Sequence, residues 1–114
     1  MGIEDLKSQI LLDVNQVGDD EIYFTTKTGD KYLMYHSQDC CESVTIDDIE
    51  GNLQDLVGHP ILQAEEVSEE DDNAFESGTW TFYKLATIKG YVTIKWYGSS
   101  NGYYSESVDF KKLR

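Results

Sequence analysis

A short stretch near the middle of the chain gathers side chains that could do chemistry. Residues 36–42 hold an imidazole, two thiols and two carboxylates, namely His36, Asp39, Cys40, Cys41 and Glu42. This mixture of ligands suits zinc, with His59 as a distant fourth ligand. The spacing argues against a metal, because adjacent cysteines point in different directions and the usual Cys-x-x-Cys pair is missing. The alternative is a corner between a strand and a helix, with one cysteine packed in the core.

The same stretch is a poor place for a nucleophile. A catalytic cysteine needs a thiolate, which the neighbouring acids Asp39 and Glu42 oppose. Adjacent cysteines rarely pair with each other, so we expect two free thiols, which is typical of a cytoplasmic protein. The chain also lacks a Gly-rich phosphate loop and the Gly-x-Ser-x-Gly and His-Glu-x-x-His motifs. We therefore expect no enzymatic activity and no catalytic residue.

A second cluster consists of carboxylates alone. Its members are Glu65, Glu66, Glu69, Glu70, Asp71 and Asp72. A calcium loop would need alternating Asp or Asn and a central glycine, which this cluster lacks. DNA carries a phosphate every ~3.4 Å along each strand, and a row of acids on a rigid frame can imitate that pattern and occupy a basic groove. The alternative is a solvated loop that promotes solubility.

The charge of the chain is concentrated around this cluster. Of the 22 Asp and Glu residues, 13 lie between Tyr32 and Tyr83, an interval without Lys or Arg. The remaining 9 acids balance the 9 bases, so the whole formal charge of −13 comes from this interval. Such a charge repels nucleic acid and anionic membranes and attracts basic proteins. The acids expected to assist the cluster are Asp47, Asp48, Glu50 and Asp55.

Tyrosines offer a third candidate surface. The strand predicted at 91–97 places Tyr91 and Tyr97 on the face opposite the core, where Tyr103 or Tyr104 joins them from the next strand. Exposed tyrosines are common in protein interfaces. The alternative is cross-strand packing that only stabilises a hairpin.

The elements that position these residues are mostly strands. Alternating apolar residues and turn signals predict strands at 9–17, 21–27, 31–36, 61–67, 79–88, 91–97 and 103–110. A helical turn is expected at 3–9. Spacings of 3 or 4 predict one or two short helices from Ile46, Ile49, Leu53, Leu56 and Val57. The stretch at 68–78 is expected to be a loop.

The predicted fold is α+β, a mostly antiparallel sheet of about six strands with a short helical insertion. Its length suits a single domain, 1–114, in which residues 37–78 form an acidic insertion and loop. No apolar run is long enough for a membrane span, and the start lacks the basic end and apolar stretch of a signal peptide. We therefore expect a cytoplasmic protein without a membrane partner.

Three segments resemble a family of small uncharacterised proteins found in bacteriophages and bacteria. They are 35–44 (YHSQDCCESV), 79–84 (TWTFYK) and 96–108 (WYGSSNGYYSESV). The resemblance extends from about Gln16 to Phe110 and transfers no catalytic residue. It implies a phage or mobile-element protein in the cytoplasm of the host cell. Small acidic proteins from that setting are often inhibitors of host defence nucleases, including anti-CRISPR and anti-restriction proteins.

These observations predict a non-enzymatic acidic protein, without a cofactor, that inhibits a basic, nucleic-acid-binding partner such as a host defence nuclease. The cluster at 65–72 would form the contact surface, and direct nucleic-acid binding is not expected. Two alternatives stay open. One is a metal-stabilised or metal-dependent protein that uses His36, Cys40 and Cys41. The other is a phage structural or assembly accessory that binds through its tyrosines.

Overall fold

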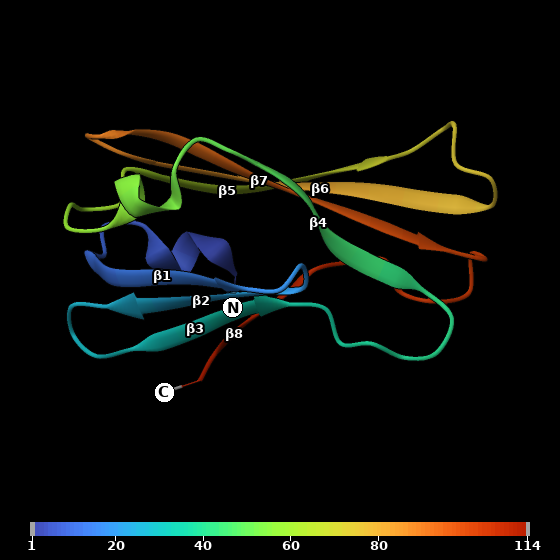
Figure 1. Ribbon diagram of the computed structural model, residues 1–114, viewed down its shortest axis with the longest axis horizontal. Coiled ribbons are helices and arrows are strands. Elements are labelled where there is room, and N and C mark those ends of the chain that lie inside the picture. Colours follow the sequence, from blue (N-terminus) through green and yellow to red (C-terminus); the bar gives the residue numbers. More distant parts are fainter. Residues whose placement is uncertain (1, 114) are drawn as a thin grey trace.

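The computed structural model describes residues 2–113 and shows two antiparallel four-stranded sheets packed as two layers (Figure 1). In one sheet the order is β1 (Leu11–Val17), β2 (Glu21–Thr26), β3 (Lys31–Tyr35) and β8 (Asp109–Lys112). In the other it is β4 (Ser43–Glu50), β7 (Gly90–Ser100), β6 (Ser77–Thr87) and β5 (Gln63–Glu70). Two single 3-10 turns, η1 (Ile3–Leu6) and η2 (Leu53–Leu56), complete the described elements.

The α+β prediction is wrong, because the expected helical insertion is mostly strand β4. A bulge interrupts the pairing of β4 with β7 between Ile46 and Asp48. The extra residue moves the next inward position from 48 to 49, so Val44, Ile46 and Ile49 all join the core. That shift produces a spacing of three in the sequence, which imitates a helix. Only η2 is helical, and it is one turn long.

The C-terminal strands are placed only in part as predicted. β6 and β7 pair over their full length and form the expected hairpin. The third strand of the expected meander does not join them. After the turn at Asn101 and Gly102 the chain crosses to the other layer, where β8 pairs with β3. The sheet of β1, β2, β3 and β8 therefore contains residues from both ends of the sequence, whereas the other sheet is built from its middle.

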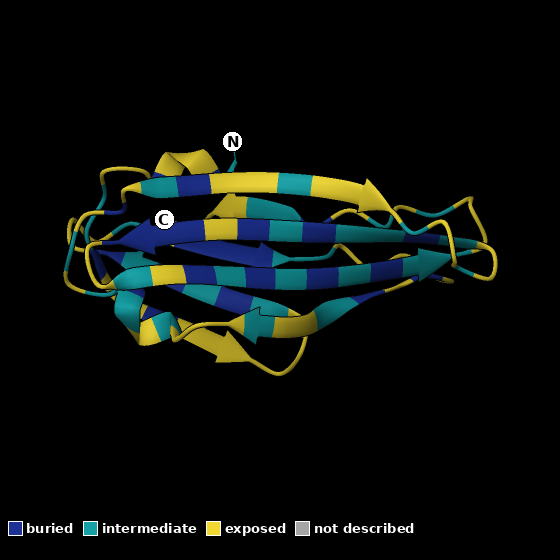
Figure 2. Cartoon of the chain, turned by 90° about the horizontal axis from the view of Figure 1, so that it is seen from above, coloured by how far each residue is buried: buried dark blue, intermediate teal, exposed yellow. Residues whose placement is uncertain are grey.

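The core lies between the two sheets. Figure 2 shows the alternation of buried and exposed positions along the strands of the upper layer. Trp96 of β7 and Met34 of β3 are both fully buried, and the indole Nε1 donates to the Met34 sulfur at 3.2 Å across the interface. The two layers are thereby held at a fixed distance, and the outer face of each sheet is left for solvent or partners.

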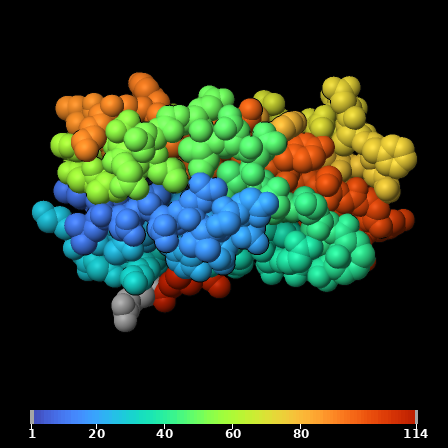
Figure 3. Space-filling view, in the orientation of Figure 1, coloured from blue at the N-terminus to red at the C-terminus, as the bar shows by residue number. Residues whose placement is uncertain are grey.

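β5 extends further than the sequence indicates. Its last residues, through Glu70, lie within the segment expected to be a loop, so the connection to β6 covers only residues 71–76. This connection projects from one end of the molecule (Figure 3). Four of the six clustered acids consequently belong to a strand.

Candidate functional site

The predicted acidic cluster begins in β5, the outermost strand of its sheet. β5 pairs with β6 from Gln63 to Glu70 without a register shift. Because side chains alternate along a strand, Glu65 and Glu69 lie on the outer face of the sheet, whereas Glu66 and Glu70 lie on the opposite side. All four side chains are exposed. The structure thus places the acids in two rows of two rather than in one row.

The last two acids of the cluster differ from each other. Asp71 is half-buried; its Oδ2 accepts a hydrogen bond from the Tyr97 hydroxyl at 2.7 Å, and its Oδ1 accepts one from the Asn73 backbone N–H at 3.0 Å. The hydrogen bond to Asp71 raises the pKa of the Tyr97 phenol, because ionisation would bring two negative charges together. Asp71 therefore anchors the β5–β6 connection, whereas Asp72 is exposed.

Three of the four acids expected to assist the cluster lie at the opposite edge of the same sheet. Asp47, Asp48 and Glu50 are exposed on β4, the opposite edge strand. With a strand spacing of ~4.8 Å, the two acidic edges are ~14 Å apart. Asp55 is half-buried in η2, and its backbone carbonyl accepts a hydrogen bond from the Thr87 hydroxyl. Asp55 thus belongs to neither edge.

The acids of β4 and β5 form no direct ion pair with the cations of residues 2–113. Within residues 2–113 the ion pairs closer than 4.0 Å are His36–Glu42 at 2.9 Å and Lys112–Asp30 at 3.4 Å. Lys95, on the outer face between the two edges, instead lies 5.6 Å from the ring centre of Trp80 and 6.0 Å from that of Phe82. Lys84 lies opposite Glu65 and Lys95 lies opposite Asp48, but within residues 2–113 neither edge forms a direct ion pair.

A buried ion pair occupies the corner at residues 36–42. His36 Nε2 lies 2.9 Å from Glu42 Oε2, and Nδ1 lies 2.7 Å from the Ser107 carbonyl oxygen. Both ring nitrogens therefore lie within hydrogen-bond distance of oxygen acceptors. The Asp39 backbone N–H also donates to Glu42 Oε2 at 3.0 Å. The hydrogen bond from His36, assisted by Asp39, lowers the pKa of Glu42 despite its burial.

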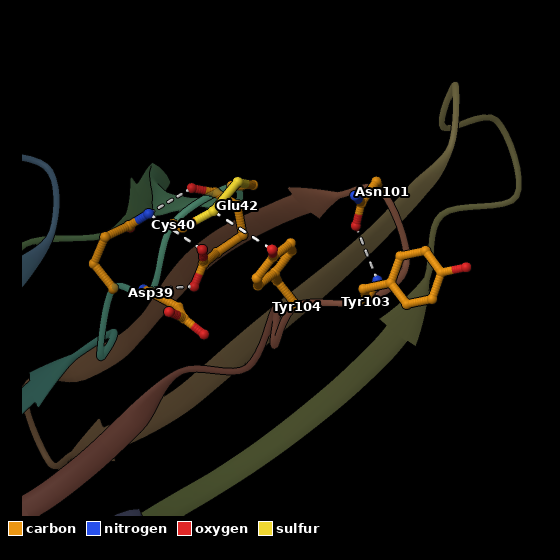
Figure 4. The surroundings of a disulfide bond; sticks show 8 residues. Asp39, Cys40, Glu42, Asn101, Tyr103 and Tyr104 are labelled. Carbon is orange, nitrogen blue, oxygen red and sulfur yellow. Dashed lines mark hydrogen bonds between the residues drawn. A yellow bond between two sulfur atoms is a disulfide. The ribbon is translucent and has the colours of Figure 1, made fainter.

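The expectation of two free thiols is wrong, because Cys40 and Cys41 form a disulfide with each other. The bond is exposed, and the Tyr104 hydroxyl points toward it at 3.5 Å from Cys40 Sγ (Figure 4). A disulfide sulfur carries no proton, so the hydroxyl is the donor in this contact. In this state neither cysteine can supply a thiolate.

The residues suggested for zinc are accordingly not arranged as ligands. Both nitrogens of His36 are engaged, both cysteine sulfurs are bonded, and residues 2–113 contain no group of three potential ligands of the His, Cys, Asp and Glu types. His59 belongs to the segment between η2 and β5, at the other end of the molecule from the 36–42 corner (Figure 1). The geometry favours the hydrogen-bonded corner over a metal site.

The tyrosines do not form one patch. Tyr91 and Tyr103 are 78% and 89% exposed, but Tyr91 lies near the start of β7 and Tyr103 follows its end. Along a strand of this length these positions are ~30 Å or more apart. Tyr97 and Tyr104 are half-buried and engaged with Asp71 and the disulfide.

Sequence reasoning missed a cavity beside the acidic strand. It has a volume of about 570 Å³ and is lined by polar residues that include Glu4, Tyr35, Glu66 and Asp109. Its three carboxylates, Glu4, Glu66 and Asp109, come from the two ends and the middle of the chain, so no local sequence pattern predicts that they lie together. Nearby, the hydroxyl of the fully buried Tyr83 has no hydrogen-bond partner. Burial raises the pKa of this phenol, and Glu66 and Asp109 raise it further.

Glu106 is a further carboxylate with a fixed position. It accepts hydrogen bonds from the hydroxyls of Thr79 and Ser100. Burial alone would raise its pKa, but the hydrogen bonds from Ser100, Thr79 and Ser77 dominate and lower it. Glu106 therefore ties the crossover between β7 and β8 to the start of β6.

Comparison with known proteins identifies the family but not an activity. A family model described as "Domain of unknown function (DUF7448)" matches residues 4–110. The expected resemblance to an uncharacterised family is thereby confirmed, whereas its motifs and phage origin stay predictions. No curated protein and no solved structure matches the chain. In residues 2–113, none of the helices has the length and apolar character needed to cross a membrane. Since the match covers nearly its whole length, the chain belongs to the family Domain of unknown function (DUF7448).

Proposed function

We propose that this protein is a non-enzymatic binding protein whose exposed acids occupy a basic, nucleic-acid-binding surface of another protein. The observation that supports this most strongly is the edge strand β5. Four of its eight residues are exposed glutamates, and none of them forms an ion pair within 4.0 Å among residues 2–113. Glutamates at this density repel one another, and a basic partner would relieve the repulsion.

The strand geometry favours recognition over a purely solubilising role. A solvated loop would hold its carboxylates in many orientations, and ordering them on binding would cost entropy. In β5 the main chain is already fixed by pairing with β6, and the two carboxylates on each face are four residues, or ~13 Å, apart. The acids therefore meet a basic surface with part of their ordering cost removed.

The partner class follows from the sign and distribution of charge. Surfaces that bind nucleic acid present Lys and Arg to phosphates. A rigid array of carboxylates can occupy such a surface and exclude its nucleic acid. The proposal includes the setting inferred from resemblance, a phage or mobile-element protein in the host cytoplasm acting on a defence nuclease. It requires no cofactor, no membrane and no direct contact with nucleic acid.

Affinity capture at low ionic strength tests this proposal with two variants of equal charge. The edge variant carries Glu→Gln substitutions at Glu65, Glu66, Glu69 and Glu70. The control variant carries Asp→Asn substitutions at four exposed acids of η1 and the other sheet, Asp5, Asp13, Asp19 and Asp20. We expect the wild type and the control to retain the same nucleic-acid-binding protein, and the edge variant to bind it at least about tenfold more weakly.

Competition completes the test. Duplex DNA or RNA, added according to the specificity of the captured protein, should displace the acidic protein, and rising salt should weaken the complex steeply. Equal retention of the edge and control variants would reject the assignment of the β5 acids. A complex that nucleic acid does not disturb would reject the occupation of a nucleic-acid-binding surface.

A further inference from the structure

β5 is an edge strand, and η1 packs against it. It is the terminal strand of its sheet and pairs only with β6 among the described strands. The Asp71 N–H donates to the Gly78 carbonyl at 2.9 Å, and hydrogen-bonded positions alternate along an antiparallel pair. The N–H and C=O groups of Glu66, Ser68 and Glu70 consequently point away from β6. They form a regular set of donors and acceptors at the edge of the molecule.

The other sheet edges in residues 2–113 are less suited to adding a strand. β4 is bulged, and its Ile46 N–H already donates to the Asp19 carbonyl at 2.6 Å. β1 is covered where the Leu11 carbonyl accepts from the Gly58 N–H at 2.9 Å and the Val14 carbonyl accepts from the Gln54 side chain at 3.3 Å. β8 has only four residues. β5 therefore combines length, regularity and an edge with which no other strand in residues 2–113 pairs.

The side chains of β5 select what can pair with that edge. From Glu65 to Glu70 they run acid, acid, apolar, polar, acid, acid. A second copy of β5 would place Glu opposite Glu, and like charges directly opposite each other are destabilising. Charged residues on an edge are a known protection against such self-pairing. A strand with Lys or Arg opposite the glutamates gains both main-chain and charge pairing.

The cavity beside Glu66 provides an independent indication of a cationic occupant. A residue directly opposite Glu66 on an added strand would project its side chain to the same side of the sheet. That side holds the opening lined by Glu4, Glu66 and Asp109. Tyr83, the residue paired with Glu66 on β6, is fully buried beneath this side of the sheet. The three carboxylates offer acceptors for an ammonium or guanidinium group.

We propose that β5 accepts an extended basic segment of the partner protein as an additional strand. In this arrangement Lys or Arg residues lie opposite the four glutamates, an apolar residue lies opposite Val67, and a small polar residue lies opposite Ser68. The cation opposite Glu66 enters the adjacent cavity. The inference rests on the proposed function and specifies how the same site is used: through main-chain pairing as well as charge.

The probe is a fluorescent peptide that contains Lys-Lys-Thr-Val-Lys-Lys, the antiparallel complement of Glu65–Glu70. Two N-methylated versions separate main-chain pairing from charge. One carries methyl groups on the residues opposite Glu66, Ser68 and Glu70, where the peptide N–H must donate to β5. The other carries them on the alternate residues, whose N–H groups point to solvent. Both have the same charge. We expect the first to bind at least about tenfold more weakly than the second, measured by fluorescence anisotropy.

A substitution in the protein provides the matched test. Ser68→Pro removes one outward N–H without touching an acid or a β5–β6 hydrogen bond, and proline is tolerated on edge strands in that orientation. Ser68→Thr keeps the N–H and is the control. We expect the proline variant to lose most of its affinity for the unmodified peptide and the threonine variant to keep it. Thermal unfolding of both variants verifies that the fold is retained.

The outcomes separate this inference from the proposed function. Equal binding of the two methylated peptides, or equal binding by Ser68→Pro and Ser68→Thr, would overturn strand addition. If the Glu→Gln edge variant still lost the unmodified peptide in that case, charge recognition by β5 would stand alone. If the edge variant bound the unmodified peptide as tightly as the wild type, the proposed function itself would fail.

Discussion

Glu42 shows how one carboxylate can stabilise an otherwise irregular corner. Its side chain is fully buried, and the side chain of its partner His36 is only 2% exposed. A charge removed from water must be paired and hydrogen-bonded, and here the imidazole, the Asp39 N–H and the Gln38 side chain at 3.3 Å supply those bonds. His36 in turn donates to Ser107, so the pair connects the segment before β4 with the segment before β8.

Glu42→Gln should change the pH dependence of stability. The pKa of Glu42 is lower in the folded protein than its ordinary value. Ionised Glu42 therefore stabilises the fold at pH values above its ordinary pKa, and this stabilisation is lost as the pH falls through the lowered pKa. We expect the variant to be less stable than the wild type at neutral pH, and the difference to shrink in acid. Urea unfolding of both proteins at a series of pH values measures this difference in stability. A difference that is constant with pH would contradict the assigned role.

At the scale of elements, β4 shows how far the sequence allows prediction. The β2–β3 hairpin is correctly predicted, because the alternation of β2 leads into a turn at Thr28, Gly29 and Asp30 and an apolar strand follows. In β4 the bulge breaks the alternation, and the resulting spacing imitates a helix.

For the candidate site, composition identifies the acidic cluster, whereas the hydrogen bond between Asp71 and Tyr97 depends on a residue 26 positions away. Such contacts have no local signal in the sequence.

The end of β4 should be sensitive to a single methyl group. Gly51 has a φ of +94°, and an added Cβ would lie 2.5 Å from the Tyr91 carbonyl oxygen. Gly29 has a φ of +95° but open space around it, so its substitution by Ala measures the cost of the positive φ without a steric clash. We expect Gly29→Ala to cost ~1 kcal/mol of unfolding free energy and Gly51→Ala ~2–4 kcal/mol. Equal costs in urea unfolding would show that β4 and β7 can separate locally to admit the methyl group.

For the whole molecule, the same charges act on folding and on binding with opposite signs. An apolar core between the sheets favours the compact state, while a formal charge of −13 opposes it. Within residues 2–113 the ion pairs engage only Asp30 and Glu42 among the acids, so the remaining acids repel one another without a direct ion pair. Screening by salt should therefore stabilise the isolated protein and weaken its complex with a basic partner.

Thermal unfolding in increasing NaCl tests whether repulsion between the acids destabilises the isolated protein. We expect the midpoint to rise by several degrees, because the repulsion is screened within a Debye length of ~10 Å at about 0.1 M salt. The salt is NaCl rather than a sulfate, because sulfate stabilises any folded protein by strengthening apolar burial and would obscure the effect of charge screening. The edge variant, with Gln at positions 65, 66, 69 and 70, should start from a higher midpoint and gain less from salt. A midpoint that stayed constant or fell in the wild type would mean that the acids do not repel one another in the folded state. The charge argument for a basic partner would then lose its physical basis.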